Sequence, residues 1–268
     1  MMAIANVPTD RTVIHPTAII HDDTRIGEGV TIGPYAIVGE RCVIGDGCTL
    51  APRAVLERNV TLAANVKVGI GSILGGDPQD LKFGGEVTFV EIGENTTIRE
   101  YSTINRGTAQ SGKTSVGSNC LIMSYVHLAH DCHVGNGVIL ANGTQFAGHV
   151  TVEDKAAVSG LCTVHQFARI GRHAYIGGSS RVPQDVPPFV LAVGNPMRLS
   201  GLNTVGLRRA KFSDETLREL KRAYRLLFRS DMNMSQALDK AEAELQPLPE
   251  VVEFLSFMRA SSQRGITS

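Results

Sequence analysis

Residues 13–50 read VIHPTAIIHDDTRIGEGVTIGPYAIVGERCVIGDGCTL, with an aliphatic side chain at every sixth position from Ile14 to Leu50. A six-residue period matches neither the 3.6-residue turn of an α-helix nor the two-residue alternation of an ordinary β-strand. It is typical of a hexapeptide β-helix, in which each repeat supplies one short strand and one turn. This stretch therefore predicts a solenoid whose aliphatic side chains point inward.

The same register continues far beyond this stretch. Of the 29 six-residue slots from Ile14 to Val182, 26 hold a large apolar side chain, and the exceptions are Asp80, Glu86 and Gln110. The exceptions fall in two segments, residues 75–89 and 106–115, which we expect to leave the solenoid as loops. Loops on a rigid scaffold often carry substrate contacts.

The period resembles that of hexapeptide-repeat proteins. This resemblance implies a left-handed parallel β-helix in which three hexapeptides make each triangular coil. The position four residues after each slot is a second inward position and is usually small. All five cysteines lie there, and no two are one coil apart: Cys42, Cys48, Cys120, Cys132 and Cys162. We interpret them as small core residues in a reducing compartment.

The repeat ends after Val182, and a different pattern follows. The segment PQDVPPFVLAVGNPMR, residues 183–198, contains four prolines, which we expect to stop strand addition. Further on, apolar side chains take helical spacing, and three helices are expected: residues 214–229 with Ser213 as N-cap, 235–245, and a third from Pro249. We predict a mainly β chain, with a β-helix over residues 1–190 and a C-terminal α-helical domain over 191–268.

Charge and hydropathy exclude several classes of protein. Lys plus Arg and Asp plus Glu both number 26, so no overall charge attracts nucleic acid. No apolar run approaches the ~20 residues that span a bilayer, so stable membrane insertion is not expected. Residues 1–16 lack the apolar stretch of a secretory signal. We therefore expect a cytoplasmic protein.

The histidines point to a site. Six of the eight lie between residues 127 and 173, and none occupies an inward position: His127, His130, His133, His149, His165 and His173. A solenoid does not need outward histidines for packing. A single one is as readily a solvated surface residue, but a cluster over neighbouring coils predicts a functional site.

The length of one coil, three hexapeptides, indicates which of these residues meet. Asp131 and His149 differ by 18 in number and should stack, and Gly148 follows His130 at the same interval. A histidine can remove the proton of a hydroxyl group, and a neighbouring carboxylate can orient its ring. A glycine amide can donate to an oxyanion. Together these groups predict acyl transfer to an alcohol.

Several longer motifs are similar to those of the UDP-N-acetylglucosamine acyltransferases of lipid A biosynthesis. The segments are IHPTAII, GGDPQDLKFGGE, IREYSTINRGT, HLAHDCHVGN, GTQFAGHVTVED, TVHQFARIG and QDVPPFVLAVGNP. The resemblance covers nearly the whole chain. It implies transfer of a 3-hydroxyacyl chain from acyl carrier protein to UDP-N-acetylglucosamine, by a homotrimer without metal or cofactor.

The resemblance also implies roles for individual residues. His130 would be the general base, Asp131 its orienting acid and Gly148 the oxyanion amide. The implied substrate-binding residues are Asp80, Lys82, His127, His149, His165, Gln166, Gly178, Asn203 and Arg209. Gly178 matches the position that gates acyl length, and we expect it to leave room for a longer chain. A basic patch should meet the acidic carrier protein, with candidates Arg169, Arg172, Arg181, Arg198, Arg208 and Arg209.

Three other interpretations compete with this one. A related hexapeptide acyltransferase could act on a UDP-3-amino sugar or another acceptor. A hexapeptide carbonic anhydrase would hold zinc through three histidines, for which His127, His130 and His149 are available. A non-catalytic scaffold would leave the histidine cluster unexplained.

Overall fold

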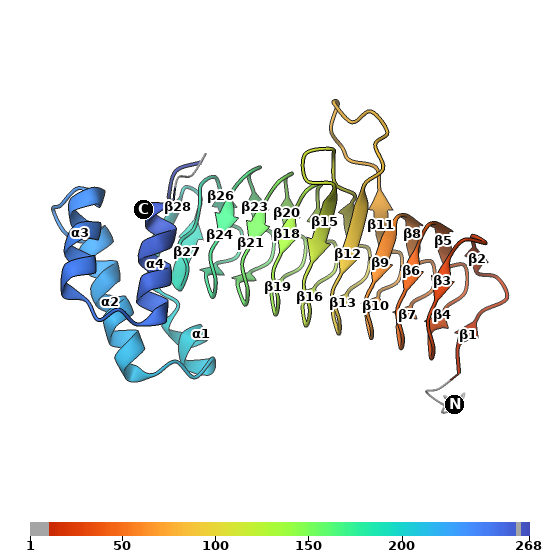
Figure 1. Cartoon of the computed structure of the whole chain (residues 1–268), viewed down its shortest axis with the longest axis horizontal. Helices are drawn as coiled ribbons and strands as arrows, with labels where there is room; N and C mark the ends of the chain where they lie inside the picture. The colour runs from red at the N-terminus through yellow and green to blue at the C-terminus, as the bar shows by residue number, and fades with distance from the viewer. Residues whose placement is uncertain (1–10, 261–263) are drawn as a thin grey trace.

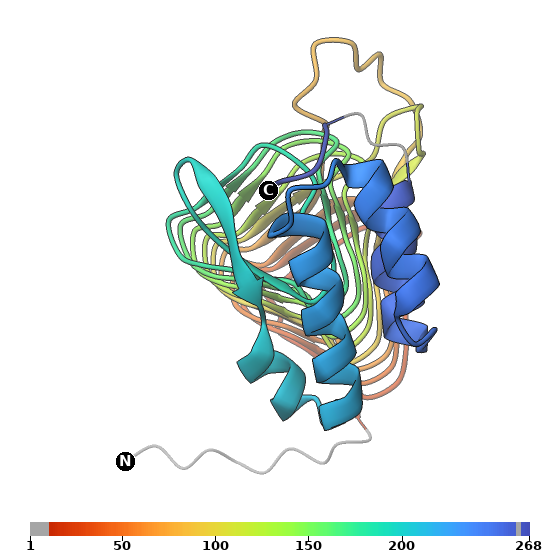
Figure 2. The same cartoon turned by 90° about the vertical axis from the view of Figure 1, so that its left-hand side faces the viewer.

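The computed structural model describes residues 11–260 and 264–268 of the 268-residue chain. It is a three-sided parallel β-helix with helices at its C-terminal end (Figure 1; Figure 2). The predicted fold class is confirmed. The prediction that residues 1–16 are not a secretory signal falls partly on residues 1–10, which lie outside the described residues.

Three sheets of stacked short strands form the sides of the prism. Sheet A contains β1 (Val13–Ile14), β4 (Thr31–Ile32), β7 (Thr49–Leu50), β10 (Lys67–Val68), β13 (Thr97–Ile98), β16 (Leu121–Ile122), β19 (Ile139–Leu140), β22 (Ala157–Val158), β25 (Tyr175–Ile176), β27 (Val190–Gly194) and β28 (Met197–Leu202). Sheet B contains β2 (Ile19–Ile20), β5 (Ile37–Glu40), β8 (Val55–Arg58), β11 (Ile73–Gly76), β14 (Thr103–Asn105), β17 (His127–Leu128), β20 (Gln145–Phe146), β23 (Thr163–Val164) and β26 (Arg181–Val182). Sheet C contains β3 (Arg25–Ile26), β6 (Val43–Ile44), β9 (Val60–Leu62), β12 (Phe89–Ile92), β15 (Lys113–Val116), β18 (His133–Val134), β21 (Thr151–Val152) and β24 (Arg169–Ile170).

The six-residue slots fill the interior, as predicted. From Ile32 onward the slots that lie in strands are buried, and all five cysteines are free and buried. Ile14, in the first coil, is 43% exposed because a coil at the end of a stack has a neighbour on one side only. Burial raises the pKa of the Cys132 thiol to about 12, which fits an inert core residue.

Both predicted loops leave the same edge of the prism. The chain runs from sheet B to sheet C to sheet A in each coil, and we call the turn from B to C the B–C edge. Residues 77–88 connect β11 to β12, and residues 106–112 connect β14 to β15. The longer loop stands out from the prism in Figure 1, with the shorter one beside it. Two consecutive coils therefore each have a loop that projects from the same place on the B–C edge.

The expectation that the prolines stop strand addition is wrong. β27 adds to β25 in parallel, and β28 returns antiparallel to β27. Pro196 does not interrupt either strand, because it lies in the turn between them. The division at residue 190 remains a proposal, since β27 begins at Val190 and continues sheet A.

Four helices complete the described part of the chain, α1 (Thr204–Arg209), α2 (Asp214–Phe228), α3 (Met234–Glu244) and α4 (Pro249–Arg259). The Ser213 hydroxyl caps α2 as predicted, accepting from the Thr216 amide at 3.0 Å. The sequence pattern does not predict the short helix α1. No helix within residues 11–260 and 264–268 has the length and apolar character needed to cross a membrane.

Ion pairs and aromatic contacts attach the helices to the β-helix. Arg172 donates to both carboxylate oxygens of Glu253 on α4 at 2.6–2.9 Å, and the Arg169 guanidinium lies 4.5 Å from the centre of the Phe257 ring. Two candidates for a carrier-protein patch, Arg169 and Arg172, are thus engaged within the chain. A charge that is already paired within the chain is a poor site for a partner.

His173 is a structural residue at this junction. It is 6% exposed, with its ring 5.1 Å from Phe212 and 6.4 Å from Phe189. Burial, together with the adjacent Arg172, lowers the pKa of His173 to about 4. The sequence pattern groups His173 with the histidines of the site. The structure instead puts it at the turn from sheet C to sheet A, under the helices.

The buried imidazole should weaken the fold in acid. An unfolded chain protonates His173 near pH 6.5, whereas the folded chain does so only near pH 4, so stability falls as pH drops through this window. The loss should reach about 3 kcal/mol. Urea unfolding between pH 7 and pH 4 should show a shallower slope for His173→Asn than for wild type. The exposed His15→Asn variant is the control, and equal slopes for wild type and His173→Asn would contradict the prediction.

Candidate active site

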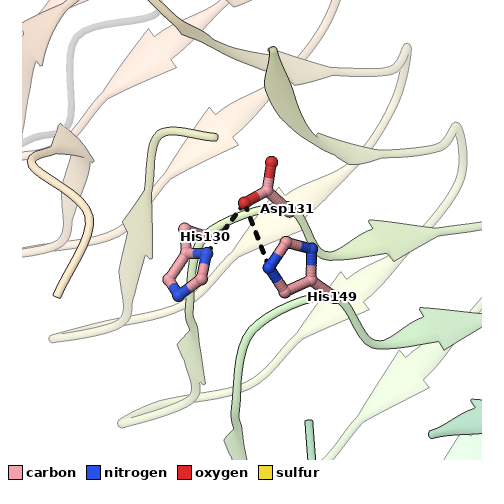
Figure 3. Close-up of side chains that lie close together, drawn as sticks. All are labelled: His130, Asp131 and His149. Atoms are coloured by element: carbon pink, nitrogen blue, oxygen red, sulfur yellow. Dashed lines mark hydrogen bonds and ion pairs between the residues drawn. The ribbon is translucent and has the colours of Figure 1, made fainter. Parts of the chain in front are cut away.

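The candidate site lies on the B–C edge, where a histidine and an aspartate adjoin in sequence. His130 and Asp131 form the turn between β17 and β18, and their side chains meet with Nδ1 of His130 2.8 Å from Oδ2 of Asp131 (Figure 3). Asp131 has φ of 59°, a left-handed conformation that aspartate tolerates better than most residues. This turn directs both side chains to the same place.

His149 comes from the next coil, as the spacing of one coil predicts. Its Nε2 lies 3.7 Å from Oδ2 of Asp131, and its ring crosses that of His130 edge-on with 5.0 Å between centroids (Figure 3). Phe167, one coil further, stacks on the other side of His149 at 4.5 Å. Burial lowers the pKa of His149, so its ring is neutral at pH 7. His149 is thus packed between the His130 ring and Phe167.

The loop of residues 106–112 completes the surroundings of Asp131. Thr108 donates its backbone N–H and its hydroxyl to the carboxylate at 2.8–3.1 Å, and the Ser111 hydroxyl donates to the same carboxylate. Burial of Asp131 opposes its ionisation, but hydrogen bonds from Ser111, His130 and Thr108 outweigh it and lower the pKa of Asp131 to about 2. Asp131 is therefore a permanent anion that can orient His130 and stabilise its protonated form.

Gly148 lies directly against the His130 ring. A methyl group built on its Cα would fall 2.5 Å from Cε1 and 2.7 Å from Nε2 of His130. Gly148 N–H has no acceptor among the residues that the structure describes. A backbone donor beside the outer nitrogen of a histidine can serve an oxyanion that forms there.

This closeness makes the His130 ring sensitive to any side chain at position 148. The φ of Gly148 is outside the left-handed region, so alanine is tolerated by the backbone, but its methyl group would displace the His130 ring. We expect Gly148→Ala to lower kcat by about 10²-fold, the loss that follows a misplacement of about 1 Å. Gly84→Ala is the control, because the added methyl meets only Glu86 Oε1, at 4.0 Å. Near-normal turnover by Gly148→Ala would show that the ring tolerates displacement.

Two pockets meet at His130. The first, of about 660 Å³, lies between the B–C edge and the loop, and its lining includes Gln79, Asp80, Lys82, Phe83, Thr108, His130, His149, Gln166 and Phe167. The second, of about 450 Å³, extends over the outer face of sheet B, and its lining includes Gln79, His127, His130, Gln145, Gly148, Thr163 and Gln166. If one substrate occupied each pocket, both substrates would lie next to the His130 imidazole.

Arg106 fixes the base of the longer loop. Its side chain is 3% exposed and pairs with Asp77, the first residue of that loop. Its guanidinium lies 5.6 Å from the centre of the Phe83 ring, and the neighbouring Asn105 amide donates to the Asp77 carbonyl at 2.8 Å. The loop that brings Asp80 and Lys82 to the first pocket is therefore attached to the solenoid at its base.

Not all sequence-predicted residues converge here. His127 lines the second pocket and shares a hydrogen bond of 2.7 Å with Thr103; burial lowers its pKa. His133 projects from sheet C, with Nδ1 2.9 Å from the Ser115 hydroxyl, so it is not part of this cluster. His165 lies beside Gln166 and contacts Arg264 instead of lining either pocket. The histidine cluster of the sequence thus divides into several places.

Gly178, Asn203 and Arg209 line neither pocket of this chain. Gly178 is exposed at the turn from sheet A to sheet B. Asn203 caps α1, accepting from the Gly206 amide at 3.1 Å and donating to the His173 carbonyl at 3.0 Å. Arg209 is exposed in the last turn of α1. Their substrate contacts remain predictions.

The sequence-based prediction misses Thr108, Ser111, Gln79 and Phe167. Thr108 and Ser111 belong to a loop that the pattern identifies, but no spacing rule predicts where a loop closes. Phe167 follows His149 by one coil, and this spacing is a usable signal.

His130, Asp131 and His149 could in geometry hold a metal ion, since one ligand atom from each lies within 4.8 Å of the others. The Asp131 carboxylate, however, already accepts hydrogen bonds from Thr108, Ser111 and His130. His127, the third histidine of the predicted zinc set, is not among these three residues, and its Nδ1 shares a hydrogen bond of 2.7 Å with Thr103. The arrangement suits an acid–base pair better than a zinc site.

Comparison with known proteins gives a consistent result. Residues 185–267 match the family described as Udp N-acetylglucosamine O-acyltransferase, Domain 2, and residues 23–58 and 113–148 match the bacterial transferase hexapeptide family. The acyl-[acyl-carrier-protein]–UDP-N-acetylglucosamine O-acyltransferase of Verminephrobacter eiseniae is 49% identical over 94% of this chain and 98% of its own length. That of Burkholderia orbicola is 48% identical, over 95% and 99%.

Solved structures agree with these relatives. The UDP-N-acetylglucosamine acyltransferase from Bacteroides fragilis superposes with a TM-score of 0.93 at 42% identity, covering 96% of this chain and all of that one. The corresponding structure from Acinetobacter baumannii gives a TM-score of 0.92 at 39% identity, over 96% and 100%. On the strength of these whole-length similarities, the chain belongs to the UDP-N-acetylglucosamine O-acyltransferase family.

Proposed function

We propose that this chain transfers a 3-hydroxyacyl chain from acyl carrier protein to the 3-hydroxyl of UDP-N-acetylglucosamine, the first step of lipid A biosynthesis. The observation that carries the proposal is the His130–Asp131 pair, which lies against Gly148 where two pockets meet. Relatives that match nearly the whole chain are named for this reaction.

The chemistry follows from the positions of these groups. With Nδ1 of His130 directed at the anionic Asp131, Nε2 is the nitrogen available as a base. Nε2 removes the proton of the sugar hydroxyl while its oxygen bonds to the thioester carbonyl carbon. Gly148 N–H donates to the oxyanion. The C–S bond then breaks, and His130 returns its proton to the leaving thiolate, so that an ester and a free thiol result.

The pockets offer one place for each substrate. Asp80, Lys82 and His149 border the first pocket, and His127, Gln145 and Thr163 border the second. We propose that these groups bind the sugar nucleotide and the acyl donor, with His165, Gln166, Asn203, Arg209 and Gly178 as further substrate contacts. The reaction needs no metal or cofactor in this mechanism.

We propose a homotrimer. An apolar stripe runs over four consecutive coils of sheet B, formed by Ile19, Ile37, Val55 and Ile73, which are stacked in register. Ile19 is 65% exposed, and Ile37 and Ile73 are 41% and 37% exposed. An exposed aliphatic stripe favours contact with another copy. A copy packed on sheet B would also enclose the second pocket, which opens on that sheet.

Carrier-protein docking and location are also part of the proposal. Arg181, Arg198, Arg208 and Arg209 are exposed, and a hollow beside α2 is bordered by Lys221, Arg225 and Arg229. These cations suit an acidic carrier protein. The five free, buried cysteines support a cytoplasmic location, because a reducing compartment keeps thiols free.

A comparison of acceptors and donors tests the proposal. UDP-N-acetylglucosamine and its 3-amino analogue would be offered together with 3-hydroxyacyl donors of several lengths on carrier protein. We expect an ester of UDP-N-acetylglucosamine as the main product, with long donors preferred if Gly178 leaves the groove open. An amide as the main product would instead favour an enzyme for the amino sugar.

A further inference from the structure

The C-terminal tail returns to the same edge of the prism as the site. The Asp185 amide, at the B–C turn after β26, donates to the Gly265 carbonyl at 2.9 Å, and the Thr267 amide donates to the Asp185 carbonyl at 2.9 Å. Ile266 thus pairs with Asp185 as a parallel bridge. The dark blue end of the chain runs beside the last coil in Figure 1. Residues 265–267 therefore pair with the last coil through an isolated parallel β-bridge.

This C-terminal tail is well anchored. Asp185 and Thr267 are 1% and 2% exposed, and Oδ1 of Asp185 also accepts from the Arg169 amide at 2.8 Å. Ile266 packs against the hydrophobic core. The tail thereby holds its first described residue, Arg264, at a fixed place on the B–C edge.

Arg264 contacts one of the predicted substrate-binding histidines. Its Nη2 lies 2.7 Å from Nδ1 of His165. A guanidinium has only donors, so Nδ1 must be the acceptor and must carry no proton. The same Nδ1 lies 3.2 Å from the Gln166 carbonyl, which would require a proton on it. Nδ1 cannot accept from Arg264 and donate to the Gln166 carbonyl at the same time. The contact with Arg264 is shorter and comes from a permanent cation, so we assign Nδ1 as an acceptor.

We propose that Arg264 is a positioning residue of the substrate site, which fixes His165 in its neutral form with the proton on Nε2. This inference rests on the proposed function, in which His165 contacts a substrate. In that form His165 offers a hydrogen-bond donor and no base. It would bind a phosphate or carbonyl oxygen of one substrate, next to Gln166, which borders both pockets.

The tautomer can be measured without any assay of turnover. Long-range ¹H–¹⁵N spectra of the imidazoles, with His165→Ala used to assign the signal, distinguish a proton on Nε2 from one on Nδ1. We expect Nε2–H in the full-length protein. A proton on Nδ1 would overturn the proposal, whatever reaction the chain catalyses. If the tautomer is as expected but the protein accepts no acyl group from acyl carrier protein, the proposed function is wrong while the proposed role of Arg264 in fixing the tautomer still holds.

Kinetics test the link to the substrate. Arg264→Met should raise the KM of one substrate by about tenfold and leave kcat within about twofold, because a binding contact and not the base is disturbed. Arg264→Lys keeps the positive charge and an N–H donor, so its KM should lie between those of wild type and Arg264→Met. A higher KM for UDP-N-acetylglucosamine would assign the oxygen to the nucleotide sugar, and a higher KM for the acyl donor would assign it to pantetheine.

Two comparisons separate positioning from a general structural role. Arg259→Met removes another arginine near the end of the chain, one that pairs with Asp239 and Glu242 on α3, and should change neither KM. In the double variant with His165→Ala, Arg264→Met should add no further loss, since it acts through His165. Additive losses, or unchanged KM values in Arg264→Met, would overturn the proposal.

Discussion

His130→Ala should lower kcat by about 10²–10⁴-fold, the contribution of a general base, while the KM values change little. Asp131 contacts Nδ1 of His130, which leaves Nε2 available to the substrates, and among the described histidines only His130 lines both pockets. His149 lies beside the pair with its Nε2 toward Asp131. Steady-state rates at saturating donor and acceptor measure the effect.

The matched control for this variant is His133→Ala. His133 lies nearby in the sequence, on β18, but its side chain points from sheet C toward Ser115. We expect it to retain nearly full activity. Equal losses in both variants would indicate a structural effect, and full activity in His130→Ala would remove His130 as the base.

Asp131→Asn should be nearly as damaging, with kcat lowered by up to ~10⁴-fold, as when the aspartate of a Ser-His-Asp triad is changed to asparagine. The Thr108 backbone N–H and the Ser111 hydroxyl, which donate to Oδ1, would hold the amide oxygen, and this leaves the amide NH₂ facing Nδ1 of His130. An NH₂ group can only donate, so it would favour the proton on Nε2. That is the nitrogen that must be free to act as the base.

Ser111→Ala separates this effect from the loss of one hydrogen bond. It removes one donor to the carboxylate but keeps the charge, and should cost only about fivefold, the value of one ordinary hydrogen bond. An Asp131→Asn variant as active as Ser111→Ala would contradict the orienting role. Rates of both variants should be compared at pH 7, where wild-type Asp131 is ionised.

Asp131 also links the site to stability in acid. Its pKa is lowered to about 2, so its contribution is complete above the unfolded value of about 3.8 and is lost as pH falls toward 2. The contribution amounts to about 2 kcal/mol. The ionised carboxylate that orients the base therefore also stabilises the folded chain.

The fold could be predicted from the sequence because one period determines it. Val68 pairs with Ile98 and Ile98 pairs with Ile122, so both loops lengthen their coils by whole multiples of the six-residue repeat. This is why the six-residue register survives both interruptions in the sequence. It is also why side chains before and after the loops still stack on one another.

The centre of the site was predictable for the same reason. Asp131 and His149, and likewise His130 and Gly148, are one coil apart, and a rigid solenoid converts this spacing directly into contact. The resemblance then implied the role of each residue. In a repeat protein, a sequence spacing of one coil therefore predicts which side chains are in contact.

The features that could not be predicted from the sequence depend on chain segments outside the repeat. The closure of Thr108 and Ser111 on Asp131 is set by a loop conformation, and the burial of His173 is set by helices that pack on its turn. The addition of β27 to sheet A depends on where the prolines fall relative to the hydrogen-bonded positions. In each case tertiary contacts, not local pattern, decide the outcome.

The role of His130 as the base for acyl transfer is tested by a single-turnover experiment with a labelled 3-hydroxyacyl group on acyl carrier protein and UDP-N-acetylglucosamine, using wild type and His130→Ala side by side. We expect wild type to move the label to the sugar as an ester at the 3-hydroxyl, and the variant to be slower by at least about 10²-fold. No transfer by wild type from any donor length, or equal rates for the two proteins, would contradict it.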